Sequence, residues 1–369
     1  MPPPAREPSP EDGMARPLPP LRTVTAVYPS PALPRRGHFI EAIHRHLEER
    51  YASEILAPRV LASDPLEEER HGAAVRRFPY PSRGRLPKAA GVSLPAAAAY
   101  LLSAGAAARR RWPRGDRLRG GLVLAHWVLP AGWIAARVAR RLGLPLVLYA
   151  HGSDLHHHGR RFPGRLLLRP ICRDARRIVA ARRELASIAI EGGGADPARV
   201  RVLPVGIDPL FAPSTEPPPP PPPVRCLFVG ALLEPTGVEA SGQALEILGR
   251  RRIDVTLTLV GDGPLAAPLR ARELPRLRIL GELDADRVRR EMARAHLLLL
   301  PSRGEGTPLV LQEAIAMALP VAATPVGGIA DLFEARSGWH PLPAGAGGEE
   351  IARVVGDLAL RGAAGVSER

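Results

Sequence analysis

Short apolar segments of strand length alternate with amphipathic segments of helix length along most of this chain. The first such unit places LRTVTAVY at 21–28, and after a Pro-rich loop it places Phe39, Ile43 and Leu47 at helical spacing. Similar units recur on both sides of seven consecutive prolines, 217–223. Parallel strands need a crossover connection, which is usually a helix. The alternation therefore predicts an α/β protein with two doubly wound parallel sheets.

The proline run marks the expected domain boundary, because polyproline is extended and lacks the N–H donors that a buried segment needs. We expect an N-terminal domain over 21–212, a Pro-rich linker over 213–223 and a C-terminal domain over 224–369, with the two Rossmann-like domains facing across a cleft. A chain of 369 residues suits two domains. Residues 1–20 lack the apolar core of a signal peptide and are expected to form a disordered leader. Residues 64–77 are rich in charge and are expected to be exposed.

Positive charge is concentrated in the first domain. Residues 1–212 carry 34 basic and 18 acidic side chains, whereas residues 213–369 carry 17 and 19. All basic residues except Lys88 are arginines, and the abundance of Ala, Pro and Gly indicates GC-rich codon usage, so arginine content alone is weak support for a nucleic-acid partner. The cationic half suits an anionic surface or ligand, which could be membrane lipid, phosphorylated lipid or nucleic acid.

An arginine-rich run follows an Ala-rich helical segment at 94–108. Basic residues with an aromatic residue beside an apolar helix are typical of a membrane interface. The alternatives are a solvated loop and a nucleic-acid contact. We expect a membrane- or acceptor-facing surface formed by Arg109, Arg110, Arg111, Trp112 and Arg114.

Neither the cysteines nor the histidines form a spacing that is typical of a metal site. Cys172 and Cys226 lie far apart, and the histidine run 156–158 has no regularly spaced Cys or acidic partner. The segment Asp284–Asp286 spells DxD, but it lies where a helix is expected to begin and is interpreted as a cap. No apolar stretch reaches about 18 residues. We expect a reduced, cytoplasmic protein, peripheral on the inner face of a membrane, without a metal or another cofactor.

The segment 296–328, HLLLLPSRGEGTPLVLQEAIAMALPVAATPVGG, carries the strongest functional signal. It predicts a buried strand, a loop, and a helix with Thr307 as N-cap and Pro308 at the first helical position, followed by another strand. Glu305 precedes this helix and Glu313 lies within it. A helix N-terminus favours a phosphate, and a nearby carboxylate can accept hydrogen bonds from sugar hydroxyls. The pattern indicates a nucleotide-sugar site; the alternative is that both glutamates are solvated.

Two loops of the first domain also follow expected strands. Gly37 permits close backbone approach to a ligand, or it only shapes the turn into the helix. His151, Gly152, Ser153 and Asp154 directly follow the apolar segment LPLVLYA. Ligands of parallel α/β sheets bind beyond the carboxyl ends of the strands, where these residues would offer a titratable ring and a carboxylate.

The motifs resemble those of retaining GT-B glycosyltransferases of family 4, the group 1 type, over roughly residues 22–360. Glu305 and Glu313, with seven residues between them, resemble the paired-glutamate motif of that family. The matching segments of the C-terminal half are FVG at 228–230, LVGDGP at 259–264, LGEL at 280–283, the segment 298–332 and GW at 338–339. Those of the N-terminal half are GHFI at 37–40, AHWVLPAG at 125–132, LVLYAHGSD at 146–154 and LPVGID at 203–208.

This resemblance implies an enzyme of hexosyltransferase type. It would transfer a sugar, with retention and without a metal, from a nucleotide-diphosphate sugar to a lipid-linked or glycan acceptor in envelope polysaccharide or glycolipid synthesis. Glu313 would hold the ribose hydroxyls, Glu305 would contact the donor sugar, and His151 would lie across the cleft near the reacting sugar. The other implied donor- or nucleotide-binding residues are Gly37, Asp154, Gly230, Thr236, Gly237, Gly263, Gly306, Thr307, Pro308 and Leu309.

The segment GALLEPTG, 230–237, departs from the family pattern G-R-L-x-x-x-K-G. Ala231 and Thr236 replace the basic pair that neutralises the leaving diphosphate, and by analogy such a loss costs about 3–4 kcal/mol of transition-state stabilisation. The sequence also ends at Arg369 after one expected helix, 349–360, so the C-terminal helices are expected to be truncated. The alternative to an active enzyme is a degenerate, weakly active or inactive paralogue that acts as a binding subunit.

Overall fold

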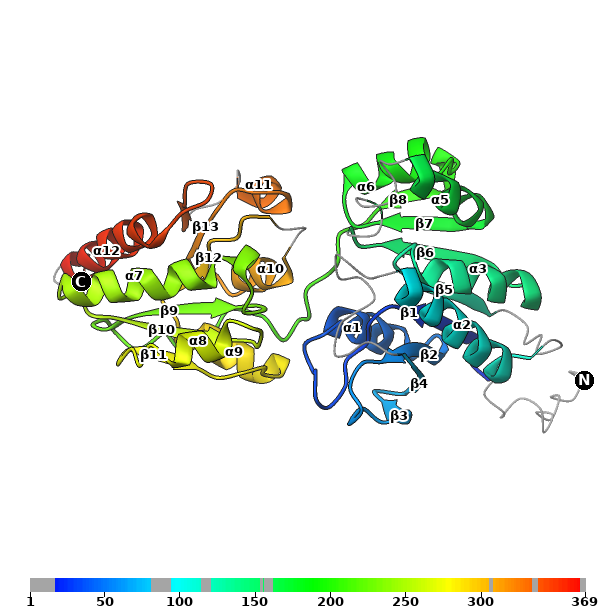
Figure 1. The fold of residues 1–369 in the computed structure, drawn as a ribbon, viewed down its shortest axis with the longest axis horizontal. Helices are drawn as coiled ribbons and strands as arrows, with labels where there is room; N and C mark the ends of the chain where they lie inside the picture. The colour runs from blue at the N-terminus through cyan, green and yellow to red at the C-terminus, as the bar shows by residue number, and fades with distance from the viewer. Residues whose placement is uncertain are drawn as a thin grey trace, which may run out of the picture. The chain divides into compact units, whose positions relative to one another are not determined.

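The chain folds into two compact units (Figure 1). The computed structural model describes residues 17–80, 94–113, 121–152, 155, 162–304, 308–333 and 338–365. The first unit contains the chain up to Val27 together with Ile40–Leu203, and the second contains Tyr28–Phe39 and the chain from Pro204 onward. The second unit thus takes up the loop that follows the first strand, and it begins ahead of the Pro-rich segment.

Eight strands form the sheet of the first unit, in the order β3-β4-β2-β1-β5-β6-β7-β8. All neighbouring strands are parallel except the antiparallel pair β3–β4. The strands are β1 Pro20–Thr25, β2 Ala52–Arg59, β3 Glu67–Arg70, β4 Ala73–Pro79, β5 Leu122–His126, β6 Leu146–Ala150, β7 Arg177–Ala180 and β8 Val200–Val202. The principal helices are α1 His38–Leu47, α2 Leu94–Arg111, α3 Ala131–Leu142, α5 Phe162–Asp174 and α6 Arg183–Ser187.

Helices α2, α3 and α5 pack on one face of this sheet and share its main core, which includes Tyr100, Ile134 and Leu168. Helix α1 contacts the other face, where the His44 ring bonds to the Ser53 hydroxyl at 2.9 Å. Successive residues of a strand point to opposite faces, so strands covered on both faces read as continuous apolar runs. This is why the local pattern predicted a parallel sheet.

Residues 64–77 are not an exposed segment, as was expected, because they contribute β3 and most of β4. Val75 and Phe78 of β4 are buried in the sheet. Arg77 is buried as well, and its guanidinium lies 2.5 Å from the Glu68 carboxylate. The charges that suggested a solvated segment therefore neutralise one another within a hairpin.

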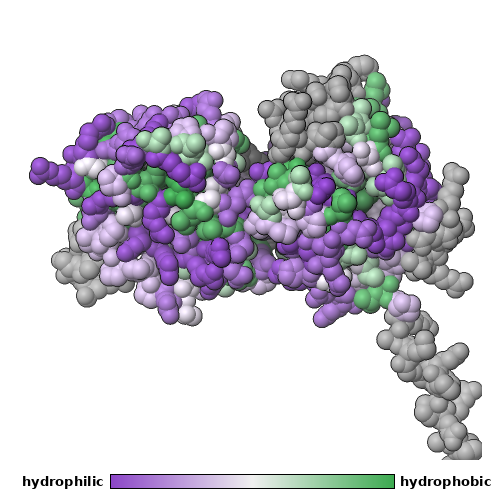
Figure 2. Space-filling view, turned by 60° about the horizontal axis from the view of Figure 1, so that its bottom comes forward, coloured by the Kyte–Doolittle hydropathy of each residue, from purple (hydrophilic) through white to green (hydrophobic). Residues whose placement is uncertain are grey.

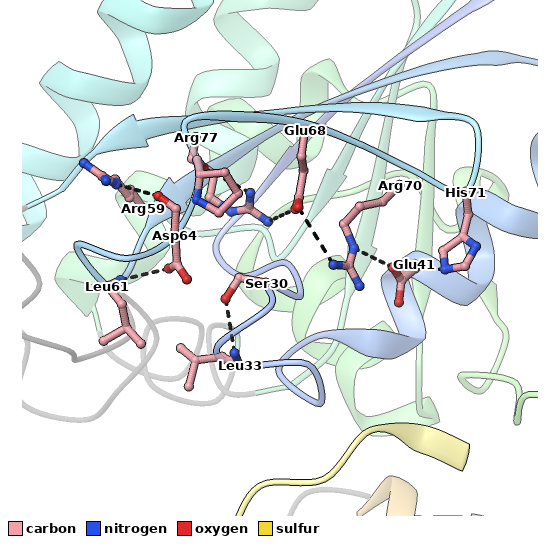
Figure 3. Close-up of polar contacts among 11 residues, drawn as sticks. Ser30, Leu33, Glu41, Arg59, Leu61, Asp64, Glu68, Arg70, His71 and Arg77 are labelled. Carbon is pink, nitrogen blue, oxygen red and sulfur yellow. Dashed lines mark hydrogen bonds and ion pairs between the residues drawn. The ribbon is translucent and has the colours of Figure 1, made fainter. Parts of the chain in front are cut away.

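Figure 3 shows how this ion-pair cluster continues onto α1. A guanidinium nitrogen of Arg70 lies 3.9 Å from Glu68, and another donates to the Glu41 carboxylate at 2.8 Å. The His71 ring also lies 3.6 Å from Glu41. Since Glu41 is largely buried, the cluster ties the edge hairpin to the helix that follows the first strand.

Six parallel strands form the sheet of the second unit, in the order β11-β10-β9-β12-β13-β14. The strands are β9 Val224–Val229, β10 Val255–Val260, β11 Leu277–Ile279, β12 Leu297–Leu300, β13 Val321–Ala323 and β14 Trp339–Pro341. The helices are α7 Val238–Arg250, α8 Ala266–Arg270, α9 Ala285–Arg294, α10 Leu309–Ala316, α11 Gly328–Phe333 and α12 Gly348–Gly365. The expected pair of parallel α/β sheets is thereby confirmed.

Hydrophobic residues at the surface occur in separate patches on the face drawn in Figure 2, within surroundings that are mainly hydrophilic. The most exposed large apolar side chains include Leu102 of α2 and Leu360 of α12. Isolated apolar side chains are normal on a protein surface. In the described part of the chain, no helix has both the length and the hydrophobicity that crossing a bilayer requires.

Candidate functional site

The candidate site of the second unit lies where its strand order reverses. β9 and β12 are neighbours, while the following strands β10 and β13 lie on opposite sides of them. The loops beyond the carboxyl ends of two such strands form the usual ligand crevice of an α/β sheet. Here they are the loop 230–237 and the described residues 301–304 and 308 between β12 and α10. The two loops touch, because the Arg303 N–H donates to the Pro235 carbonyl at 2.8 Å.

Two of the glycines expected to bind the donor have a packing role at this edge. A Cβ atom on Gly237, whose φ is +72°, would lie 2.1 Å from the Pro301 carbonyl oxygen. A Cβ atom on Gly263 would lie 2.5 Å from the Leu232 carbonyl oxygen. Both positions need glycine so that adjacent loops can pack, whether or not a ligand binds. Contact of either glycine, or of Gly230, with a donor stays a prediction.

Thr236 is tied to its own loop. Its hydroxyl hydrogen-bonds to the carbonyl oxygens of Leu233 and Ala231, at 2.7 and 3.1 Å. The loop thus keeps the turn that brings Gly237 to the start of α7, but it offers no positive charge at positions 231 and 236.

Glu313 lies inside α10 and is almost fully buried, so it is not a solvated surface residue. Its two carboxylate oxygens accept hydrogen bonds from the Arg35 guanidinium at 2.7 and 2.9 Å. The His38 Nε2 atom lies 3.1 Å from one of these oxygens. Burial raises the pKa of Glu313, but the hydrogen bonds and charges of His38 and Arg35 outweigh burial and lower that pKa overall. Glu313 is therefore ionised at neutral pH.

Arg35 lies in the loop before α1 and His38 is the first residue of that helix; both belong to the segment Tyr28–Phe39 of the second unit, and sequence reasoning missed both. They flank Gly37, whose φ of +81° makes the sharp turn into α1. The Arg35 guanidinium carbon also lies 5.7 Å from the centre of the Phe211 ring. The structure thus brings the segment that contains Gly37 close to Glu313, and the signal that could have found Arg35 was its place two residues before that glycine.

The start of α10 differs slightly from the prediction. Pro308 occupies the N-cap position with extended backbone, and Leu309 is the first helical residue. Pro308 therefore precedes the helix instead of opening it. The predicted residues Glu305, Gly306 and Thr307 lie outside the described residues, as does Asp154 of the first unit.

Asp284 caps α9, as its position in the sequence suggested. Its carboxylate accepts a hydrogen bond from the Arg287 N–H at 2.8 Å, and its backbone is extended. This is the geometry of a helix N-cap.

His151 lies directly after β6, within a group of aromatic rings in the first unit. Its Nε2 atom lies 2.9 Å from Nδ1 of His126, and the two rings are stacked at 5.2 Å. Tyr149 stacks on it at 4.4 Å, and Trp127 packs at 4.9 Å. The orientation of the His151 ring is thus set by three neighbours, none of which sequence reasoning named as a site residue.

His126 ends β5 and is completely buried. Burial is the main cause that lowers the pKa of His126, and the nearby His151 and His44 lower it further. This pKa therefore lies well below its ordinary value. A neutral imidazole carries one N–H and one acceptor nitrogen. The short contact to His151 therefore links the proton positions of the two rings.

Trp127 adopts a backbone conformation that is rare for a residue with a side chain. Its φ is +71°, and its N–H donates to the Tyr149 carbonyl at 2.9 Å. Strained backbone of this kind concentrates at functional sites. The sequence signal that could have identified Trp127 was its place in AHWVLPAG, where the chain leaves a central strand.

The prediction that Trp112 belongs to a membrane- or acceptor-facing surface is wrong. This side chain is only 1% exposed, and its indole N–H donates to the Glu54 carboxylate at 2.5 Å. Arg111 binds the other oxygen of Glu54 at 2.7 Å. Helix packing against β2 therefore buries a tryptophan that the local pattern placed at an interface. Arg109 and Arg110 are exposed, whereas Arg114 lies outside the described residues.

Two family models match consecutive parts of the chain. The model described as Glycosyltransferase Family 4 matches residues 30–211, which lie mostly in the first unit. The model described as Glycosyl transferases group 1 matches residues 223–359, which contain the second sheet, α10 and Glu313. Together the two models cover both units in the order that the resemblance requires.

Curated relatives agree with this assignment. TuaC of Bacillus subtilis, a glycosyltransferase assigned by name to teichuronic acid biosynthesis, is 29% identical over 222 residues, 58% of this chain and 55% of TuaC. The 2-deoxystreptamine glucosyltransferase of Streptomyces kanamyceticus is 28% identical over 60% of this chain and 62% of that protein. The chain thus spans between 55% and 62% of the length of these two relatives.

Solved structures show the same fold. Sucrose-phosphate synthase of Thermosynechococcus elongatus superposes with a TM-score of 0.66 at 17% identity, covering 93% of this chain and 90% of that one. Anabaena HepE in complex with UDP and glucose superposes with a TM-score of 0.63 at 18% identity, covering 91% and 89%. The consecutive family matches and this shared fold establish that the chain belongs to the GT-B glycosyltransferases of the group 1, family 4 type.

Proposed function

We propose that this protein transfers a sugar from a nucleoside-diphosphate sugar to a hydroxyl group of a lipid-linked or glycan acceptor in envelope polysaccharide or glycolipid synthesis. The observation that carries the proposal is the buried, ionised Glu313, which lies in the helix following the crevice loops of the second sheet. The similar HepE structure is a complex with UDP and glucose, and the relatives TuaC and AmsK are named for teichuronic acid and amylovoran biosynthesis.

Glu313 would bind the ribose of the nucleotide. A carboxylate has about four acceptor sites, and Arg35 and His38 occupy three of them. One site remains for a ribose hydroxyl, and the neighbouring donors keep the carboxylate charged. The diphosphate would lie at the start of α10, where the helix dipole favours negative charge.

The reaction would proceed with retention. The acceptor hydroxyl oxygen bonds to the anomeric carbon on the face that the diphosphate leaves. The bond between the anomeric carbon and the phosphate oxygen breaks, its electron pair stays on the diphosphate, and the hydroxyl proton passes to that leaving oxygen. His151 would hydrogen-bond to the transferred sugar. No step needs a metal, so a chelator is expected to leave the rate unchanged.

The first unit would bind the acceptor and an anionic membrane surface. Helices α2 and α3 carry no acidic residue. Arg109 of α2 and three arginines of α3 line a hollow of about 460 Å³ between the helices. Vesicles that contain phosphatidylglycerol should sediment the protein at low salt, whereas phosphatidylcholine vesicles should not. Equal binding to the two kinds of vesicle would show that the protein does not recognise an anionic membrane surface.

Calorimetric titration of the whole protein with UDP, GDP and ADP tests the donor site. We expect micromolar binding of one nucleotide and hydrolysis or transfer of the corresponding nucleotide-sugar. If the folded protein binds none of them, the proposed function is wrong.

The second candidate function is a nucleotide-sugar-binding subunit with little or no turnover. Ala231 and Thr236 favour it, because neither supplies charge to the leaving diphosphate. Tight nucleotide binding together with undetectable transfer would support this second candidate. A gain of transfer in Thr236→Lys would show that the missing charge is the cause, whereas no gain would argue that lost neutralisation of the diphosphate is not the defect.

A further inference from the structure

The crevice loops of the second sheet are acidic. Side chains of Glu234, Asp262, Glu282 and Asp284 lie in the loops that follow β9, β10 and β11. Among the described residues of the loops that follow the six strands, Arg303 is the only lysine or arginine. Two of these carboxylates are already balanced, because Arg36 of the segment 28–39 lies 3.5 Å from Glu282 and Arg287 of α9 lies 3.7 Å from Asp284. An entering nucleoside diphosphate brings further negative charge and needs a cation of its own.

Arg303 lies beside the position where that charge is missing. Its N–H donates to the carbonyl of Pro235, the residue before Thr236, at 2.8 Å. The close approach of Gly237 to the Pro301 carbonyl confirms that the two loops are packed together. Arg303 is distant from Thr236 in the sequence, so only the pairing of β9 with β12 brings the two residues together.

The Arg303 side chain is held only loosely. It is 61% exposed, and its guanidinium contacts the Glu234 carboxylate, itself 74% exposed, at 2.8 Å. Exposed ion pairs of this kind contribute little and exchange readily. A planar guanidinium also matches two phosphate oxygens at once. Arg35, by contrast, is 15% exposed and is held by the buried Glu313.

We propose that Arg303 supplies the positive charge that neutralises the diphosphate of the nucleotide, in place of the basic pair missing at Ala231 and Thr236. Glu234 holds the guanidinium at the crevice until the nucleotide displaces it. This inference rests on the proposed function, because it requires that the second unit bind a nucleotide.

Titration of the whole protein with UDP, or with GDP or ADP if UDP does not bind, tests this role through binding alone. Arg303→Ala should weaken diphosphate binding about tenfold or more and leave binding of the matching nucleoside unchanged. Arg303→Lys should keep part of the affinity, because it retains the charge but loses the planar fork. If the wild type binds UDP and Arg303→Ala binds it equally well, Arg303 has no such role although the proposed function stands. If the wild type binds no nucleotide, both fail.

A second set of variants separates diphosphate binding from simple neutralisation of Glu234. If Arg303 only balances Glu234, the double variant Arg303→Ala, Glu234→Ala should regain wild-type affinity, and that result would overturn the proposal. We expect the double variant to keep a low affinity for the nucleotide. Thr236→Lys should restore affinity in the Arg303→Ala background and raise it less in the wild type.

Arg251 provides a matched control within the same unit. It is an exposed arginine that binds the exposed Glu349 at 2.6 Å, and it lies at the opposite end of α7 from the crevice. Arg251→Ala should leave UDP affinity unchanged. An equal loss in both variants would show that overall charge, and not the position of Arg303, controls binding.

Discussion

Arg35 binds both carboxylate oxygens of Glu313, at 2.7 and 2.9 Å, although the two residues are 278 positions apart in the chain. The pair fastens the loop after β1 to α10 within the second unit. The same carboxylate is the one that we propose binds ribose. If Glu313 binds ribose as we propose, one buried carboxylate both holds this loop and recognises the nucleotide.

Removing Arg35 should destabilise the protein. Arg35→Ala leaves the buried Glu313 carboxylate with the His38 ring beside it but without its guanidinium partner, and breaking one side of a buried ion pair costs about 3 kcal/mol. Urea unfolding followed by circular dichroism should show a lower midpoint. Arg251→Ala removes an exposed ion pair and should change stability by less than about 1 kcal/mol. Equal effects in the two variants would show that burial of the pair contributes nothing.

Glu313→Gln should weaken nucleotide binding about tenfold. The amide keeps the shape of the side chain but loses the charge and one acceptor oxygen, and a lost hydrogen bond to a charged group costs about 1.5–3 kcal/mol. Calorimetric titration with UDP measures the change. Glu349→Gln alters an exposed carboxylate and serves as the control. An unchanged dissociation constant in a folded Glu313→Gln protein would show that Glu313 does not bind the nucleotide.

His126 should influence turnover through His151. Replacing it with leucine removes the 2.9 Å contact that orients the His151 ring, and we expect kcat to fall by up to about 100-fold with little change in KM. Asparagine places a polar atom near the Nδ1 position and should restore part of the rate. Nitrogen-15 chemical shifts of the His151 ring should report a change of tautomer in the leucine variant. A rate loss without that change would indicate a packing role only.

Acid should destabilise the protein through His44. Burial lowers the pKa of His44 to about 4, compared with about 6.5 in an unfolded chain. The stability that the neutral His44 ring contributes is complete above about pH 6.5. It is lost as pH falls towards 4, because only the unfolded chain gains the proton in that interval. The loss reaches about 3 kcal/mol.

Urea unfolding at pH 7 and pH 4.5 measures this dependence. His44→Asn should flatten it in part, and the remaining dependence should include His126, whose pKa is also lowered. An unchanged pH dependence in His44→Asn would show that the buried ring does not control acid stability.

Local pattern was enough to predict the α/β class, most strand positions and the place of Glu313 inside a helix. Periodicity and helix caps depend on neighbours within a few residues, so 255–260 and the cap at Asp284 could be placed from sequence. The paired-glutamate spacing likewise lies within one short segment. The same local reasoning failed for 64–77 and for Trp112, because their burial depends on partners elsewhere, Glu54 among them.

The sequence by itself thus determined the parallel α/β class, the family resemblance and the carboxylate in α10. Only the tertiary structure decided which groups meet that carboxylate and that crevice. Arg35 reaches Glu313, His126 reaches His151, and Arg303 reaches the loop of Thr236 through the order of strands in each sheet. Strand order joins loops that are distant in the chain, and no local periodicity contains that information.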